Sequence, residues 1–439
     1  MKVILISPNF FNMTRVKEET SLGLLYLATE IQDICEVKVI DAPLEDKEDQ
    51  EIINEIEKID PEIVGISVNF ANALNSAKKI AKRLKNNNFK GFLILGGNTA
   101  TFLYEQLLTK NYADIIVLHE GETTFKELLT TVKKYFSNKS SLWEELSRIK
   151  GIAFKNGNNL VVTDKRDSIK DLDSIKIPER DYLDNYYQNT NTISIISSRG
   201  CPYNCYYCST NAMWKNWRSR SAKNIVAEIE YIKKKYPNIN HFSFVDDNFL
   251  VNRKRAEEFA QLLLAKKLDI NFDFLTRIEH VNEDILKTLK KVGLTNMFFG
   301  VESGSPRILK LLNRHYTPNE VIKKTKYAEN LGIKITASFI IGFPWEEEKD
   351  IRETLDLIDQ TPSTYTQVHI CTPYPGTPFF ESAKEFGITL HIKDLSEIKQ
   401  DEEVYMETKY LKAADILSWY KKAVSDILKK QYIQKIKKS

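Results

Sequence analysis

The sequence has few cysteines, no excess of charge of one sign and no long apolar run. Five of its 439 residues are cysteine, too few for a disulfide framework, which favours a reducing compartment. Lys and Arg number 63 against 60 for Asp and Glu, so charge gives no reason to expect nucleic acid or a membrane as partner. The apolar run at residues 3–6 is too short for a signal peptide or a membrane span, and no later apolar run is long enough to span a membrane. We therefore expect a cytoplasmic protein that binds neither nucleic acid nor a membrane.

What remains is the composition of an ordinary globular protein, with 42% hydrophobic and 28% charged residues. The length predicts about two or three domains. Changes of pattern along the chain divide it into residues 1–137, 138–189, 190–390 and 391–439.

The first part alternates short apolar runs with helical periodicity. The runs, which we interpret as strands, are residues 3–6, 37–40, 63–66, 92–95 and 115–118. One segment between them carries Ala77, Ile80, Ala81 and Leu84 on one helical face. This alternation predicts a doubly wound, Rossmann-like parallel sheet, in which ligands bind beyond the carboxyl ends of the strands.

The turn after the first predicted strand has no G-x-G-x-x-G pattern, which argues against a dinucleotide ligand. Gly96 and Gly97 end the fourth predicted strand. Two adjacent glycines let a bulky planar ligand approach the backbone, but they are equally typical of a plain tight turn. The residues alone leave both interpretations open.

Residues 138–189 read as a connector that contains a β-hairpin. Residues 151–154 and 160–162 are its predicted strands, and the sequence Asn-Gly-Asn-Asn between them is its turn. Residues 391–439 form a charged extension, in which Ile416, Tyr420 and Val424 lie on one stripe of an amphipathic helix.

Residues 190–390 contain six further strand-like runs with helices between them. They are residues 193–196, 242–245, 272–275, 297–301, 335–341 and 366–370. Six strand–helix units predict a partial (β/α)6 barrel, whose chemistry gathers at the carboxyl ends of the strands.

Cys201, Cys205 and Cys208 lie just after the first of these strands, with the spacing C-x3-C-x2-C. Soft thiolates at this density favour zinc or an iron–sulfur cluster. A structural zinc site needs four ligands, whereas a cubane held by three thiolates keeps one iron open for a substrate or cofactor. The alternatives are a structural zinc knuckle and thiols that are buried as small hydrophobic groups.

This spacing, with an aromatic Tyr207 before the last cysteine, resembles the radical S-adenosylmethionine (SAM) superfamily. The elements D-D-x-F, G-x-E-S-G and I-I-G-x-P-x-E follow in order, and residues 373–378 look like the cobalamin-dependent branch. The resemblance implies that the three cysteines hold a 4Fe–4S cluster whose open iron binds SAM. Reductive cleavage of SAM then gives a 5′-deoxyadenosyl radical.

The resemblance also implies a set of SAM contacts at the ends of the predicted strands. Asp247 would accept from the SAM ammonium group, Arg277 would pair with its carboxylate, and Glu302 would bridge the ribose hydroxyls. Tyr207 would stack on the adenine, and Gly342 would let backbone lie against it. Each residue, seen alone, is more typical of a structural turn.

Four pieces of the first part, at residues 21–28, 64–67, 95–97 and 119–122, resemble the cobalamin-binding domain that precedes many radical SAM enzymes. The D-x-H-x-x-G signature, whose His ligates cobalt in other cobalamin proteins, is absent. The implied cobalamin contacts are Ser67, Asn69, Gly96, Gly97, His119, Glu120 and Gly121. For His119, a structural hydrogen bond is the alternative.

The resemblance implies a cobalamin-dependent radical SAM enzyme. Its expected reaction is methylation, via methylcobalamin, of an unactivated carbon or phosphorus centre in a small-molecule or peptide substrate. A non-methylating reaction such as cyclisation, ring contraction or oxidation is the nearest alternative. A metal- or corrinoid-binding sensor is the alternative of another class. A methylthiotransferase needs a second cluster in the first part, where Cys35 is the only cysteine.

Cys371 follows the sixth predicted strand of the second half. It is a candidate catalytic thiol, and a small buried hydrophobic residue is the alternative. The implied electron donor is a flavodoxin or a ferredoxin.

Overall fold

A computed structural model describes residues 1–10 and 21–438, without the side chains of residue 139 and residues 432–438. The chain divides into two units, residues 1–194 with 394–397, and residues 195–393 with 398–439. The finer division at residues 137, 189 and 390 stays a prediction.

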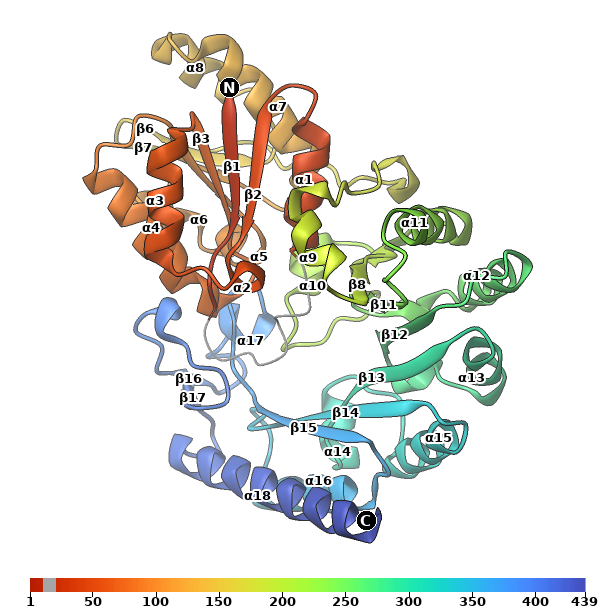
Figure 1. Cartoon of the computed structure of the whole chain (residues 1–439). Coiled ribbons are helices and arrows are strands. Elements are labelled where there is room, and N and C mark those ends of the chain that lie inside the picture. The colour runs from red at the N-terminus through yellow and green to blue at the C-terminus, as the bar shows by residue number, and fades with distance from the viewer. Residues whose placement is uncertain (11–20, 439) are drawn as a thin grey trace. The chain divides into compact units, whose positions relative to one another are not determined.

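The first unit is built on a seven-stranded sheet in the order β2-β1-β3-β4-β5-β6-β7 (Figure 1). Its parallel strands are β1 (Lys2–Ser7), β2 (Glu36–Asp41), β3 (Ile63–Ser67), β4 (Phe92–Gly96) and β5 (Ile115–Val117). All five contain the predicted runs to within a residue. Their near-continuous apolar sequences arise because both faces of the sheet are covered. The order 2-1-3-4-5 is that of a doubly wound fold whose direction reverses between β1 and β3.

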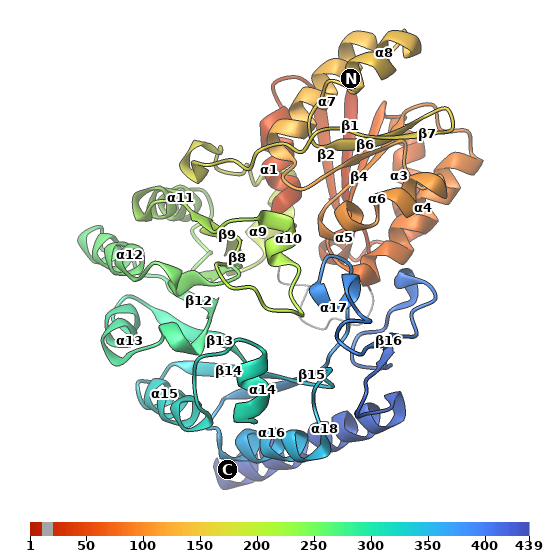
Figure 2. The same ribbon diagram turned by 180° about the vertical axis from the view of Figure 1, so that it is seen from behind.

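Helices cover both faces of this sheet (Figures 1 and 2). On one face α3 (Asp49–Ile59) packs against α4 (Leu74–Asn86), and on the other α1 (Leu22–Ile31) packs against α7 (Glu122–Tyr135). The stripe predicted on α4 is buried. The shorter helices of this unit are α2 (Ala42–Glu45), α5 (Asn98–Phe102), α6 (Tyr104–Thr109), α8 (Lys139–Leu146) and α9 (Asp184–Gln188).

The predicted hairpin is present as β6 (Ile152–Asn156) and β7 (Asn159–Val162), with Gly157 at a φ of 60° in the turn. It is also part of the sheet, because β6 pairs antiparallel with β5. The sequence predicted the hairpin but not this pairing, since periodicity does not show which strand is a neighbour.

A second sheet, in the order β8-β11-β12-β13-β14-β15, begins with β8 at the boundary between the units and has its other five strands in the second unit. The strands are β8 (Thr192–Ile195), β11 (His241–Phe244), β12 (Asn271–Thr276), β13 (Leu294–Glu302), β14 (Lys334–Ile341) and β15 (Tyr365–Ile370). Adjacent strands from β11 to β15 are parallel. The two ends of the sheet, β8 and β15, are not neighbours, so the predicted partial barrel is confirmed.

Helices follow the strands of this sheet along its outer side (Figure 1). They are α11 (Ala222–Lys235), α12 (Arg253–Ala265), α13 (Glu283–Lys290), α15 (Pro318–Asn330) and α16 (Glu348–Gln360). Shorter elements at the strand ends are β9 (Ser198–Arg199), α10 (Thr210–Trp214), β10 (Arg218–Ser219), α14 (Pro306–Leu311) and α17 (Pro378–Glu381).

The C-terminal extension is only partly helical. The helix α18 (Ala413–Lys438) packs against β14, β15 and α16. Before it, β16 (Thr389–Leu390) pairs with β17 (Met406–Glu407). The intervening residues 394–397 belong to the first unit, where Asp394 lies 2.7 Å from Lys78 Nζ.

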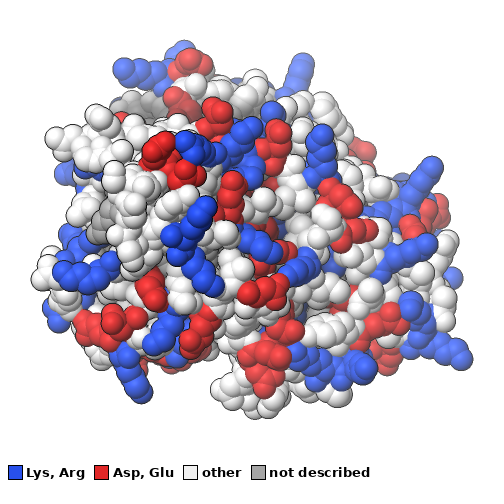
Figure 3. Space-filling view, turned by 90° about the horizontal axis from the view of Figure 1, so that it is seen from above, with Lys and Arg blue, Asp and Glu red and all other residues white. Residues whose placement is uncertain are grey.

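The surface seen in Figure 3 carries basic and acidic side chains interspersed over one face. Such mixing follows from the near balance of the two charges in the composition. Within residues 1–10 and 21–438, no helix combines the length and the apolar character that a membrane crossing needs.

Candidate functional site

The three clustered cysteines lie on the loop between β9 and α10, and all three are partly buried. The loop begins at Gly200, whose φ is 81° and where a Cβ would lie 2.7 Å from Asn216 O. Only glycine fits such a position without strain. The amide of Cys208 donates to Cys205 O at 3.1 Å, which closes the loop into a turn.

The thiols are close enough to influence one another. Burial raises the pKa of Cys201, and it raises the pKa of Cys208 to about 11, with Cys205 adding to both shifts. In the described part of the chain, no three His, Cys, Asp or Glu side chains converge on a single metal ion. The thiolates of a cubane bind different irons, so they need not converge on one point. Three thiols without a fourth ligand thus fit a 4Fe–4S cluster better than a zinc ion.

Arg277, at the end of β12, reaches the cysteine loop. Its Nη1 lies 3.7 Å from Cys205 Sγ, and its guanidinium lies 3.6 Å from the centre of the Tyr203 ring. Glu279 Oε1 accepts from Arg277 Nη2 at 2.5 Å, which fixes the other side of the guanidinium. The structure therefore places this predicted residue beside a cysteine, as its strand-end position indicated.

The two aspartates after β11 have separate surroundings. Asp247 accepts from Thr210 Oγ1 at 3.0 Å, and Thr210 contacts Cys208 Sγ at 3.2 Å, so Asp247 is connected to the cysteine loop. Burial raises the pKa of Asp247. Asp246 instead accepts from the amide of Ser197 at 2.6 Å inside the unit, where its role is structural.

Glu302 and Tyr207, predicted as separate SAM contacts, touch each other. Tyr207 OH donates to Glu302 Oε1 at 2.9 Å. Arg314 Nη2 donates to Tyr207 OH and to Glu302 Oε1. This arginine is 7% exposed. Sequence reasoning missed Arg314, because it follows α14 and no strand-end pattern marks it.

Gly342 directly follows β14 and has a φ of 97°, a conformation that favours glycine. A Cβ there would lie 2.9 Å from Ile416 of α18, so the missing side chain also makes room for this helix. Glu346 Oε2 accepts from the amides of Gly342 and Phe343 at 2.6 and 3.0 Å. This buried carboxylate, for which the sequence analysis predicted no role, fixes the turn.

Cys371 lies in an apolar cluster with Phe343, Phe379 and Met406, and it is 3% exposed. Burial raises its pKa well above the usual value. A thiol that stays protonated and covered is a poor nucleophile, so these surroundings favour a packing role.

In the first unit, four predicted cobalamin residues lie at the ends of β3 and β4. Asn69 Nδ2 donates to Ser67 Oγ at 3.2 Å, and Gly96 is the last residue of β4. Gly97 has a φ of 94°, and a Cβ there would lie 2.6 Å from Asn69 Oδ1. The backbone of the two strand ends is therefore in close contact.

The other three predicted residues follow β5. His119 has a φ of 60°, and its amide donates to Thr101 Oγ1 at 3.1 Å. Glu120 Oε2 accepts from the amide of Ile169 at 2.7 Å, and a Cβ on Gly121 would lie 3.1 Å from Leu27. Each of the three therefore makes a contact within the first unit that fixes its position.

An exposed aromatic residue at the same edge was missed by the sequence analysis. Phe70, three residues after β3, is 52% exposed, and its ring centre lies 6.0 Å from that of Phe10 after β1. A large apolar side chain in this position is a candidate platform for a planar ligand. Its place beyond a predicted strand was the available signal.

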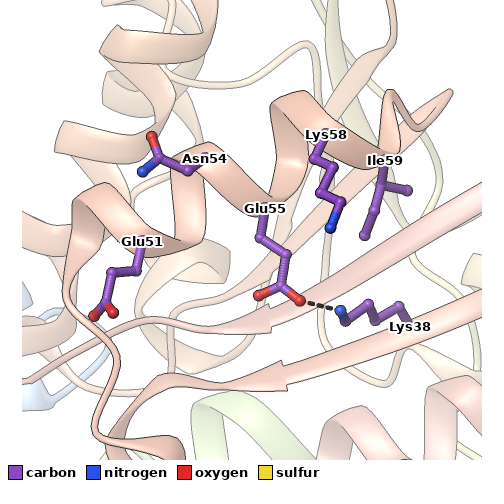
Figure 4. Close-up of a pocket in the computed structure, with 6 residues that line it drawn as sticks. All are labelled: Lys38, Glu51, Asn54, Glu55, Lys58 and Ile59. Carbon is purple, nitrogen blue, oxygen red and sulfur yellow. Dashed lines mark hydrogen bonds and ion pairs between the residues drawn. The ribbon is translucent and has the colours of Figure 1, made fainter.

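The pocket in Figure 4 is not part of this site. It lies between α3 and β2, where Lys38 pairs with Glu55. Lys2, at the start of β1, donates to Ile59 O in the same region. The pocket is thus near the amino ends of the parallel strands, opposite the edge where ligands bind in this fold.

Two protein-family models match the chain in the predicted order. The B12 binding domain matches residues 10–129, and the Radical SAM superfamily matches residues 195–358. An anaerobic magnesium-protoporphyrin IX monomethyl ester cyclase of Rubrivivax gelatinosus is 26% identical over 407 residues, 90% of this chain and 71% of the relative.

Among solved structures, the radical SAM methyltransferase TsrM from Kitasatospora setae, with cobalamin and a 4Fe–4S cluster bound, has the same fold. The TM-score is 0.75 at 16% identity, over 97% of this chain and 88% of the other. An uncharacterized methyltransferase of Pyrococcus horikoshii is 34% identical over 391 residues, 87% of this chain and 83% of that protein. With that identity along most of both chains and both family models matched, the chain belongs to the cobalamin-dependent radical SAM enzymes, whose cofactors are a 4Fe–4S cluster, SAM and cobalamin.

Proposed function

We propose that this enzyme transfers a methyl group to a carbon or phosphorus centre that is not nucleophilic. The observation that carries the proposal is the 34% identity to a protein named as a methyltransferase, which extends over both units. When bound, the reduced cluster supplies the electron that cleaves SAM, and cobalamin supplies the methyl group. The chain's own residues bind these groups, orient them and exclude water.

In the second unit, Cys201, Cys205 and Cys208 would hold three irons of the cluster. Arg277 already contacts Cys205, so it would stabilise negative charge on the thiolate and remain near the SAM carboxylate. Asp247, connected to the cysteine loop through Thr210, would accept from the SAM ammonium group.

The remaining SAM contacts in this proposal are Tyr207, Glu302 and Gly342. The Tyr207 ring lies 5.6 Å from that of Phe343, the neighbour of Gly342, so Tyr207 and Gly342 are close enough to meet the same adenine. Glu302 would bind the ribose through the oxygen that Tyr207 and Arg314 do not occupy.

In the first unit, we propose that cobalamin lies over the carboxyl ends of β3, β4 and β5. Ser67, Asn69, Gly96 and Gly97 would meet it at the first two strands, and His119, Glu120 and Gly121 would meet it at the third. Phe70 is added to this set because its exposed ring fits the apolar face of a corrin.

Product ratios test methyl transfer. Each turnover uses one SAM as methyl donor, which leaves S-adenosylhomocysteine, and a second SAM as radical source, which leaves methionine and 5′-deoxyadenosine. The protein, reconstituted anaerobically with iron, sulfide and cobalamin, would be incubated with methyl-labelled SAM and extracts of small molecules and peptides. We expect a labelled product with the two nucleosides in a ratio near one. Substrate-dependent 5′-deoxyadenosine without S-adenosylhomocysteine or label would contradict methyl transfer.

A non-methylating radical reaction is the second candidate, and the similarity to a protein named as a cyclase favours it. It predicts 5′-deoxyadenosine or reused SAM, with no transfer of label to the product. The same incubation therefore separates the two candidates.

Radical SAM enzymes act on small-molecule or peptide substrates and need a reductant. We propose that a flavodoxin or a ferredoxin is the reductant here and that the protein works in the cytoplasm, where the cysteines stay reduced. Reconstitution with each purified donor would test the first part. A donor that supports no 5′-deoxyadenosine formation, where dithionite does, would be excluded.

A further inference from the structure

Glu302 has a strained backbone. Its φ is 64°, and Ser303 N donates to Val301 O at 2.8 Å across it, which makes a three-residue turn of the rare positive-φ kind. The pairing of β13 with β14 also shifts register between Gly300 and Glu302. Strain of this kind persists only where the surrounding structure holds it, and it is common at functional sites.

The side chain of Glu302 is held from two sides. It folds back over Gly300, where a Cβ would lie 2.1 Å from Glu302 Oε1. On the other side, the same Oε1 receives hydrogen bonds from Tyr207 OH and from Arg314 Nη2. Tyr207 OH also accepts from Arg314, so the three groups form a closed triangle with one direction for each bond.

Arg314 is poorly explained as a stabilising residue. Its side chain is 5% exposed, and its Nε and Nη1 are buried without a hydrogen-bond partner among the described residues. Buried donors without acceptors destabilise a fold. Burial alone would lower the pKa of Arg314, but Tyr207 and Glu302 raise it, so the guanidinium stays charged.

The triangle joins segments that are distant in sequence. Tyr207 lies between Cys205 and Cys208, Glu302 ends β13, and Arg314 follows α14, where its amide donates to Leu309 O at 2.8 Å. A change at Arg314 is therefore transmitted both to the proposed ribose contact and to the loop that carries the cysteines.

We propose that Arg314 is a positioning residue of the SAM site, which holds the strained Glu302 and the cysteine-loop Tyr207 in the arrangement that binds SAM. This inference rests on the proposed SAM contacts but not on methyl transfer. It predicts that replacing Arg314 by an uncharged residue weakens SAM binding beyond what the accompanying loss of thermal stability would cause.

The test compares Arg314→Met, Arg314→Lys and Glu302→Gln in the full, cluster-loaded protein. The matched control is Arg220→Met, because Arg220 forms an equally buried ion pair with Glu228 elsewhere in the second unit. The readouts are the SAM dissociation constant by equilibrium dialysis, KM and kcat for 5′-deoxyadenosine formation, the effect of SAM on the cluster EPR spectrum, and the thermal midpoint.

We expect Arg314→Met to raise the SAM dissociation constant and KM about tenfold, and Arg314→Lys to restore part of the loss. The control should lower the thermal midpoint similarly and leave SAM binding within twofold. If Glu302→Gln weakens SAM binding while Arg314→Met leaves it equal to that of the control, the inference is overturned and the SAM site stands. Unchanged SAM binding in Glu302→Gln would overturn both the role of Arg314 and the proposed contact of Glu302 with SAM.

Discussion

The two units hold their ligand-facing residues by different means. At the strand ends of the first unit the constraint is shape, because Gly97 has a positive φ and leaves no room for a Cβ. At the strand ends of the second unit Gly342 is also constrained by shape, but charge is an added constraint, because Arg277 pairs with Glu279 and Arg314 with Glu302. The first edge should therefore be sensitive to volume, and the second to loss of a charge.

The largest effect is expected in the second unit, at the cysteine loop. Replacing Cys205 by alanine should remove the cluster and reduce 5′-deoxyadenosine formation to that of the protein-free blank, because one iron loses its ligand. Iron and sulfide analysis with EPR measures the cluster. Cys371→Ala is the control, and it should keep a full cluster because Cys371 lies in the apolar core. Normal turnover in Cys205→Ala would contradict the assignment.

A volume change should break the first edge. Gly97→Ala should destabilise the first unit by about 1–3 kcal/mol and weaken cobalamin binding, because the new Cβ meets Asn69 and the φ is strained. Visible-absorbance titration with cobalamin and thermal unfolding measure the two effects. Gly23→Ala on α1, where nothing lies within 4 Å, should leave both unchanged or raise stability slightly. Equal behaviour of the two variants would show that shape is not the constraint.

Removal of an exposed ring should have a smaller effect. Phe70→Ala should weaken cobalamin binding about tenfold without lowering the thermal midpoint, because the ring is exposed until a ligand covers it. Leu264→Ala on α12, which removes a similarly exposed apolar side chain, should not change cobalamin binding. If both variants bind cobalamin like the parent, Phe70 does not contact the corrin.

The smallest expected effect is a pH dependence of stability in the second unit, which comes from a single buried carboxyl group. Burial raises the pKa of Glu346 to about 8, from 4.5 in the unfolded chain. The folded state therefore binds a proton that the unfolded state releases, and stability from this group falls as pH rises towards 8. Burial also raises the pKa of Asp41, to about 6, and lowers the pKa of His280 from 6.5, so only the part of the slope between pH 6 and pH 8 that is lost with the carboxyl belongs to Glu346.

Glu346→Gln should remove most of this pH dependence, since the amide oxygen still accepts from the turn and has no proton to lose. Thermal midpoints at pH 6 and pH 8 measure it, at about 2–4 °C per kcal/mol for a unit of this size. An unchanged slope in the variant would show that Glu346 is ionised in the folded protein.

The strands and the reaction class could be predicted from the sequence, whereas the contacts between strand ends could not. The eleven apolar runs marked strands because parallel strands are buried on both faces. The cysteine spacing and the strand-end motifs indicated the family, because each is a short run of residues that can be recognised in the sequence itself. Arg314, Phe70 and the pairing of β6 with β5 were missed, because each depends on a neighbour brought close only by folding.

We propose above that Cys201, Cys205 and Cys208 hold the cluster that cleaves SAM reductively. The most direct measurement is 5′-deoxyadenosine formation by anaerobically reconstituted protein with dithionite and SAM. This nucleoside should form with the parent and should be lost in each of Cys201→Ala, Cys205→Ala and Cys208→Ala. If the parent contains four irons per chain but forms no 5′-deoxyadenosine, or if all three variants still form it, these cysteines do not hold a cluster that cleaves SAM.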